Sequence, residues 1–155
     1  MPRYFYIGLL VLLTVVAAVL FAYRTIPATP SPAIAEFGGV SLRIEYATTT
    51  AMQEKGLGGR ASIPNDYGML FVFQKDDKYG FWMKGMLVPI DIFWLNDKRQ
   101  VVSITQNAAP SSYPNVFYPT ESARYVLETT TGFASEHNIT IGAFLLLKNF
   151  EHVSE

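Results

Sequence analysis

The sequence contains no cysteine and only two histidines among its 155 residues. Without cysteine there can be no disulfide bonds, thiol catalysis or zinc sites built on thiolate ligands. His137 and His152 both fall in polar stretches near the end of the chain, so we expect them at the surface rather than in a metal centre or a catalytic triad. Neither a metal ion nor another cofactor is expected.

Motifs for nucleotide binding and hydrolysis are also missing. The stretch GLGGRA (56–61) lacks the last glycine of a dinucleotide fingerprint and does not follow a predicted strand. No GxxxxGK[ST], HExxH, GxSxG or SxxK pattern occurs. The lack of a nucleophile–histidine pair favours a non-catalytic protein.

Charged residues make up only 16% of the chain and form no basic cluster. Only two of the twelve Lys and Arg residues, Arg3 and Arg24, precede residue 36, which leaves ten against thirteen Asp and Glu in the remainder. Nucleic acid is therefore not an expected partner, because phosphate neutralisation needs a concentrated positive face.

One long apolar run stands out against this composition. Residues 4–23, YFYIGLLVLLTVVAAVLFAY, are twenty residues without a charge. As a helix they would be about 30 Å long, which matches the hydrocarbon core of a bilayer. Arg3 and Arg24 flank the run, and aromatic residues lie at both of its ends. We therefore predict an N-terminal membrane anchor over residues 1–24, with the lipid bilayer as partner of residues 4–23.

A cleaved signal peptide is the alternative for this segment. Signal peptides have apolar regions of about 7–15 residues, shorter than this run, and the best cleavage site, Ala33-Ile34-Ala35, lies well beyond it. We expect a single-pass protein of the cell membrane with a cytoplasmic N-terminus and a periplasmic or extracellular domain; the alternative is a secreted protein. Residues 25–36, with three prolines, predict a stiff linker, and residues 37–155 a single domain.

The domain sequence reads mostly as short strands. Alternation in SLRIEY (41–46) predicts a half-buried strand, and MLFVF (69–73) predicts a central one. Further strands are expected at 81–84, 90–95, 100–106, 123–129 and 144–148, and short helices at 48–57 and 132–138. The predicted fold class is α+β and β-rich: about seven strands in a small curled sheet or partial barrel, with two short helices.

Charges within apolar surroundings are the candidate site residues. Asp91 lies in GFWMKGMLVPIDIFWL (80–95), where an unpaired carboxylate would cost several kcal/mol if buried. Arg124 and Glu128 share one face of their predicted strand. Asp91 and Arg124 could form a structural ion pair that fixes strand register. Alternatively, these groups together with Arg60 and Lys84 line a pocket for a polar ligand or for acid–base chemistry.

An uncharged loop, AAPSSYPNVFYPT (108–120), supplies further aromatic residues. Its rings, Tyr118 among them, could stack on a sugar or on a partner protein. The favoured interpretation is a lid that packs on the core of its own domain.

Several stretches resemble one family in order and spacing. KGLGGR (55–60), GMLFVF (68–73), FWMKGMLVPIDIFWL (81–95), VVSI (101–104) and YPTESARYVLE (118–128) are similar to the domain of unknown function 192. The resemblance covers residues 40–147. It implies a small β-rich α+β domain of bacteria and archaea, often preceded by a signal or anchor segment, and it implies no activity. Gly85 departs from the asparagine that is common there, which weakens a catalytic proposal.

These observations lead to a candidate ligand site and to two functions. The candidate ligand-binding residues are Arg60, Trp82, Met83, Lys84, Asp91, Tyr118, Arg124 and Glu128, with Trp82 and Met83 as the floor of a cleft. The first function is a membrane-anchored, non-catalytic module that binds a polar ligand, a glycan or a partner protein. The alternative is a hydrolase or lyase of envelope carbohydrate with Asp91 and Glu128 as acid and base. A structural part of an envelope complex is a third possibility.

Overall fold

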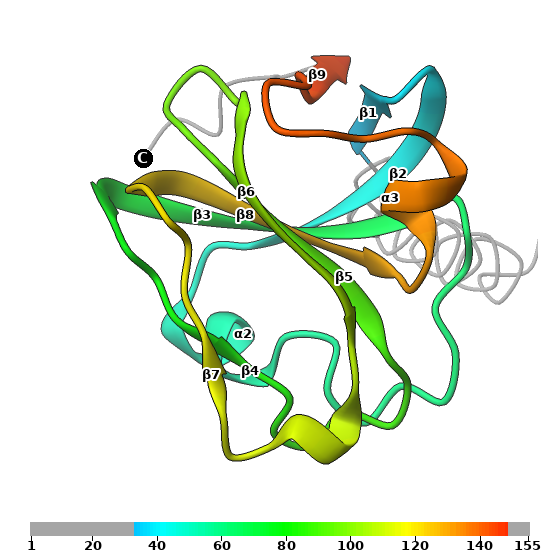
Figure 1. Ribbon diagram of the computed structural model, residues 1–155, viewed down its shortest axis with the longest axis vertical. Coiled ribbons are helices and arrows are strands. Elements are labelled where there is room, and N and C mark those ends of the chain that lie inside the picture. Colours follow the sequence, from blue (N-terminus) through cyan, green and yellow to red (C-terminus); the bar gives the residue numbers. More distant parts are fainter. Residues whose placement is uncertain (1–32, 149–155) are drawn as a thin grey trace, which may run out of the picture. The chain divides into compact units, whose positions relative to one another are not determined.

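The computed structural model describes residues 33–148, which form two sheets and two short α-helices (Figure 1). The larger sheet has the order β6-β5-β8-β3-β2-β1-β9, and β4 and β7 form a separate pair. Its strands are β1 (Ala33–Phe37), β2 (Val40–Ala47), β3 (Tyr67–Asp77), β5 (Ile90–Leu95), β6 (Val101–Ala108), β8 (Ala123–Thr130) and β9 (Leu146–Lys148). The pair consists of β4 (Phe81–Trp82) and β7 (Val116–Phe117), and the helices are α2 (Thr50–Lys55) and α3 (Phe133–Glu136).

The residue patterns explain where each strand lies in the sheet. In β2, Leu42 and Ile44 are buried while Arg43 between them is exposed, which is the alternation of a half-covered strand. Every residue of β5 is buried, as expected for a strand covered on both faces. The pairing of β2 with β3 is parallel and all other pairs are antiparallel, so the larger sheet is mixed.

Two apolar clusters cover the two faces of the larger sheet. One contains Phe71, Phe81 and Trp94 and lies on the side of α2 and β4. The other contains Phe93 and Leu127 and includes residues of α3. Figure 1 shows α2 and the β4–β7 pair away from α3. Successive residues of a strand point to opposite faces of the sheet. Adjacent residues of β5 and β8 therefore belong to different clusters.

The sheet curls at one end without closing. Gln100 forms an isolated bridge with Phe144, and Val101 N donates to Ala143 O at 2.8 Å, so the segment before β9 reaches the start of β6. The strand order nevertheless ends at β6 and β9. The expected β-rich curled sheet is confirmed in this open form, and the partial barrel is not closed.

The seven predicted strands and both short helices are present, with shifted ends. Two strands were missed: β7 lies in the loop 108–120, and β1 occupies residues 33–37, so the predicted linker 25–36 runs into the sheet. The predicted anchor lies outside the described residues, among which no helix is long and apolar enough to cross a membrane.

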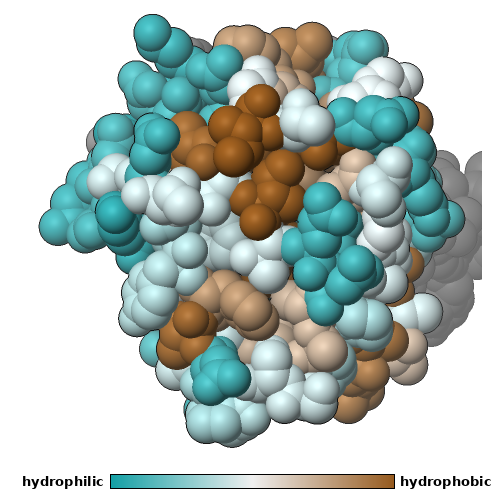
Figure 2. Space-filling model, viewed as in Figure 1, coloured by the Kyte–Doolittle hydropathy of each residue, from teal (hydrophilic) through white to brown (hydrophobic). Residues whose placement is uncertain are grey.

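Some apolar side chains remain at the surface of the domain. Trp82 and Tyr118 are exposed at the β4–β7 pair, and Ile141, Phe144 and Leu146 near β9. Figure 2 shows apolar residues in patches among polar ones on the face that it displays.

Candidate functional site

Asp91 is fully buried and is held by backbone amides. Its Oδ1 accepts from Asn107 N at 2.8 Å, and its Oδ2 accepts from Ala134 N at 2.9 Å. Gly132, the N-cap residue of α3, has no side chain to cap the helix, so Asp91 supplies the acceptor from a distant strand. Asn107 has a φ of 53° where the register of β6 shifts against β5. Asp91 therefore ties this irregular strand end to α3.

The expected pairing of Asp91 with Arg124 is wrong. Arg124 Nε donates to Asp76 Oδ1 at 2.5 Å near the surface, and the hydrogen bonds of the Asp91 side chain go to the two amides. Two amide donors stabilise a buried carboxylate without a countercharge. The question that the sequence raises about Asp91 thus has a structural answer.

Arg60 also has partners that its sequence surroundings did not indicate. Its guanidinium donates to Glu45 at 2.9 Å and to the hydroxyl of Tyr67 at 2.8 Å. The Tyr67 hydroxyl donates in turn to Glu45. Burial, followed by the hydrogen bond to Glu45, raises the pKa of Tyr67 to about 12. The group is a closed network at the edge of the domain.

Glu128 is the second buried carboxyl, and it faces the other side of the sheet. In the register of β8, Glu128 is opposite Ile92 on one side and Met69 on the other, whereas Asp91 is opposite Thr129. Directly opposed residues share a face, so the carboxyls of Asp91 and Glu128 point to opposite faces. The acid–base pair expected from them is therefore wrong.

The Glu128 carboxyl is incompletely satisfied. The residue is 4% exposed, the Leu57 amide hydrogen-bonds to its carboxyl, and Oε2 has no partner. Burial raises the pKa of Glu128 to about 8, against the opposing effects of the Leu57 amide and the Arg60 charge. At neutral pH the group is mainly a neutral acid, so one of its oxygens carries a hydrogen.

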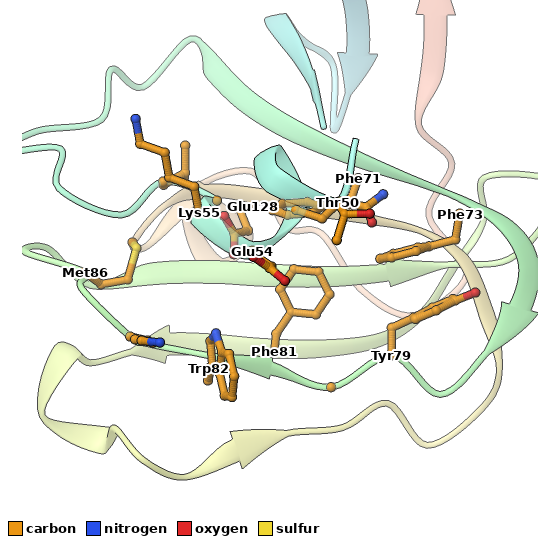
Figure 3. A pocket seen from close by; sticks show the side chains of 15 residues that line it. Thr50, Glu54, Lys55, Phe71, Phe73, Tyr79, Phe81, Trp82, Met86 and Glu128 are labelled. Atoms are coloured by element: carbon orange, nitrogen blue, oxygen red, sulfur yellow. The ribbon is translucent and has the colours of Figure 1, made fainter. Parts of the chain in front are cut away.

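Glu128 lies in the wall of a pocket of about 230 Å³ between α2 and β4. We call it the α2–β4 pocket. It is lined by Thr50, Gln53, Glu54, Lys55, Gly56, Leu57, Phe71, Phe73, Tyr79, Gly80, Phe81, Trp82, Lys84, Met86 and Glu128 (Figure 3).

Aromatic residues of β3, of β4 and of the turn between them build one wall of the α2–β4 pocket. Phe73 and Tyr79 stack with ring centroids 3.6 Å apart, and Phe71 meets Phe81 edge to face at 4.8 Å. These contacts fix the rings in place. Trp82 at the mouth is 47% exposed, and the Lys84 ammonium group lies 5.7 Å from its ring centroid.

Helix α2 and the turn after it build the opposite wall. The Gln53 side-chain amide donates to Ala47 O at 3.1 Å and to Val72 O at 3.0 Å, which fastens α2 to β2 and β3 and leaves the Gln53 carbonyl as a free acceptor. Gly56 ends the helix with a φ of 50°. A Cβ at this position would lie 3.3 Å from Glu128 Oε2, so a glycine here lets the turn approach the carboxyl.

Three of the eight predicted site residues meet at this pocket: Trp82, Lys84 and Glu128. The others lie apart. Met83 is buried in the apolar cluster next to the pocket, and Tyr118 is 64% exposed outside it. Asp91, Arg60 and Arg124 serve the structural contacts described above.

The polar wall of the pocket was not predicted from the sequence. Thr50, Gln53 and Glu54 follow the i, i+3, i+4 spacing of one helical face. This spacing was a usable signal within the predicted helix 48–57. The stacking of Phe73 on Tyr79 across the end of β3 had no such signal, because it depends on how the chain turns between them.

Comparison with known proteins gives a family match and similar solved structures. The model of the family described as an uncharacterized ACR, DUF192, matches residues 33–146. A structure from Sinorhizobium meliloti, described as a proposed transcription regulator, is 25% identical with a TM-score of 0.69 and covers 74% of this chain and 91% of its own. A protein of unknown function from Novosphingobium aromaticivorans is 29% identical, with a TM-score of 0.68. The match covers 77% of this chain and 88% of that protein's chain. No curated protein matches the chain.

Proposed function

The chain belongs to the DUF192 family, and for this member we propose a role as a binding module that takes up a small polar ligand in the α2–β4 pocket. The proposal follows the first function expected from the sequence. It moves the site from the predicted cleft of Arg60, Asp91 and Arg124 to the pocket at Glu128.

A single observation carries this proposal: the carboxyl of Glu128, a residue that lines an open pocket, has a buried Oε2 without a hydrogen-bond partner. Among residues 33–148 only one other buried side-chain polar atom, Arg99 Nε, is without a partner. Leaving such a group unsatisfied costs about 1–3 kcal/mol. A ligand that hydrogen-bonds to Glu128 recovers this free energy, and apolar walls with a few convergent polar groups are typical of ligand sites.

The proposed setting is the outer side of the cell membrane. The support is the uncharged run of residues 4–23 with Arg3 and Arg24 at its ends. A domain tethered close to the bilayer would meet ligands of the cell envelope.

A DNA-binding role, of the kind suggested by the description of the Sinorhizobium meliloti protein, is not proposed for this chain. Four of its basic residues, Arg43, Arg60, Arg124 and Lys148, are already engaged with carboxylates. The excess of acidic residues after residue 36 also opposes contact with phosphates.

A carbohydrate hydrolase is the second candidate, with Glu54 in place of Asp91. Glu54 lines the same pocket as Glu128, and a raised pKa suits Glu128 to act as general acid. The second carboxylate of such an enzyme acts as nucleophile or base. Release of reducing sugar from a glycoside substrate, and its loss in Glu54→Gln, would identify this activity.

The binding role is tested by thermal unfolding of the full chain with a panel of probes: methyl glycosides, amino acids, acetate and tetramethylammonium. A ligand at about ten times its Kd adds about 1.4 kcal/mol to the free energy of unfolding. This raises the midpoint temperature of thermal unfolding by several degrees. We expect at least one class to stabilise the wild-type protein and not Trp82→Ala. Phe144→Ala removes an aromatic of similar exposure, 50%, outside the pocket and should respond like the wild type. No response to any class would contradict the proposal.

A further inference from the structure

The α2–β4 pocket has two unlike walls. Thr50, Gln53 and Glu54 present oxygen atoms from α2. The aromatic rings of Phe73, Tyr79, Phe81 and Trp82 stand opposite (Figure 3). A ligand that fits both walls is a small molecule with one polar edge and one apolar face. The volume of about 230 Å³ lies below the ~300–1,000 Å³ of pockets for drug-sized molecules, so it suits a single ring.

The charges at the pocket do not select an ion. Glu54 and Lys84 have opposite signs, and Lys84 already lies over the Trp82 ring. Figure 3 shows the Lys55 ammonium group turned away from Phe81 and Trp82. With Glu54 opposed by Lys84 and Lys55 directed outward, no strong net charge faces the interior of the pocket. An uncharged ligand is favoured.

Glu128 determines which atom this ligand must present. The Leu57 amide donates to the carboxyl, and Oε2, the oxygen without a partner, lies 3.3 Å from where a side chain at Gly56 would begin. In its neutral form the carboxyl carries one hydrogen. The pocket therefore offers one buried O–H donor that requires an acceptor oxygen.

We propose that the α2–β4 pocket binds one sugar unit, with its C–H face on the aromatic wall, its hydroxyl edge on α2 and one ring or hydroxyl oxygen accepting from Glu128. This inference rests on the proposed binding function and specifies its ligand class. An aromatic ring packs against the C–H face of a pyranose, while hydroxyl groups bond to the acceptors of Glu54 and Gln53. A single pyranose ring thus supplies both the apolar face and the polar edge that the two walls require.

The test measures binding to the full chain by isothermal titration, with the methyl glycosides of glucose, galactose, mannose and N-acetylglucosamine as probes. Tetramethylammonium and acetate are the ionic controls. We expect at least one glycoside to bind with 1:1 stoichiometry, and both ions to bind at least tenfold more weakly. Trp82→Ala and Glu128→Leu should each lower the affinity for this glycoside at least tenfold. Glu128→Gln keeps an N–H donor and should lose less than Glu128→Leu, and Phe144→Ala should bind like the wild type.

The contrary outcomes separate the two proposals. Binding of an ion without any glycoside would overturn the sugar proposal and leave a ligand pocket in place. Glycoside binding that Trp82→Ala leaves unchanged would place the sugar elsewhere and also overturn it. If Glu128→Leu does not fold, the affinity of Trp82→Ala for the glycoside decides on the sugar proposal. The binding of no probe at all would contradict both proposals.

Discussion

The two buried carboxyls of this domain are stabilised in opposite ways. Asp91 accepts from two backbone amides and joins β6 to α3. Glu128 leaves one oxygen without a partner. A carboxyl with both oxygens satisfied is a structural element, whereas one with an unsatisfied oxygen in the wall of a pocket is a candidate contact for a ligand. The local sequence does not distinguish them, because both residues stand among apolar neighbours in central strands.

Glu128 should make the stability of the domain depend on pH. Its pKa is raised by burial from 4.5 to about 8 in the folded state, so the folded protein holds a proton that the unfolded chain has lost between these values. The contribution of Glu128 to the free energy of unfolding therefore falls as the pH rises from about 4.5 to 8 and is constant above. Because glutamine does not titrate, the free energy of unfolding of Glu128→Gln should rise relative to that of the wild type as the pH increases, by about a few kcal/mol.

Urea denaturation at pH 5, 7 and 9 measures this difference. Glu121→Gln removes a carboxylate from the exposed surface and serves as control. In both variants the other charges that act on Glu128 or line the pocket stay unchanged, namely Arg60, Glu54, Lys55 and Lys84. Equal pH profiles for Glu128→Gln and Glu121→Gln would show that the buried carboxyl carries no extra proton.

Asp91 should be required for stability rather than for binding. Asp91→Ala leaves the amides of Asn107 and Ala134 without their acceptor, and we expect a loss of about 2–5 kcal/mol. Arg124→Ala removes only an ion pair near the surface, which should cost about 1 kcal/mol or less. Chemical denaturation measures both. Similar losses for the two variants would contradict the roles assigned to them.

At the scale of elements, most strands were predicted from alternation and apolar runs. The polarity of each side chain indicates whether its position in the strand is buried or exposed. The strand β1 was missed because prolines before it suggested a linker. The strand β7 was missed because two residues are too few to show a pattern. Register, the parallel β2–β3 pair and the face of Glu128 depend on contacts between distant segments, which no local pattern contains.

The same limit applied to the site. Trp82, Lys84 and Glu128 were found because they are unusual in their surroundings, while the polar face of α2 looked like an ordinary exposed helix. Arg124 was paired with the wrong acid because Asp76 lies 48 residues away in the chain. Sequence alone identified the charged residues in apolar surroundings and not their partners.

The turn that ends α2 gives a prediction at this scale. Gly56 has φ 50° and ψ −137°, a conformation adopted almost only by glycine, and its missing Cβ lies 3.3 Å from Glu128 Oε2. Gly59 also has a positive φ, 79°, but an added Cβ there meets nothing within 4 Å. We expect Gly56→Ala to lower the free energy of unfolding by at least about 1 kcal/mol more than Gly59→Ala. Equal losses in thermal unfolding would show that the approach to Glu128 does not constrain the turn.

At the scale of the whole molecule, the structure bears on the choice between an anchor and a signal peptide. The best cleavage site, Ala33-Ile34-Ala35, falls inside β1, where Ala35 is fully buried and pairs with Leu42 and Leu147. Cleavage after Ala35 would remove three of the five residues of this strand. This placement argues against cleavage at that site, and the membrane anchor stays a proposal.

The anchor proposal predicts that the full chain stays in the membrane fraction after alkaline extraction, with its N-terminal residues present by mass spectrometry. Leu13→Lys together with Val16→Lys places two charges in the middle of the run, at about 2.5–3.5 kcal/mol each for insertion. This double variant should move to the soluble fraction, whereas Arg124→Lys in the domain should not. A mature chain that begins after Ala35 would replace the anchor with a secreted protein. Because β1 would then lack its first three residues, that protein should unfold at a lower temperature than the uncleaved chain.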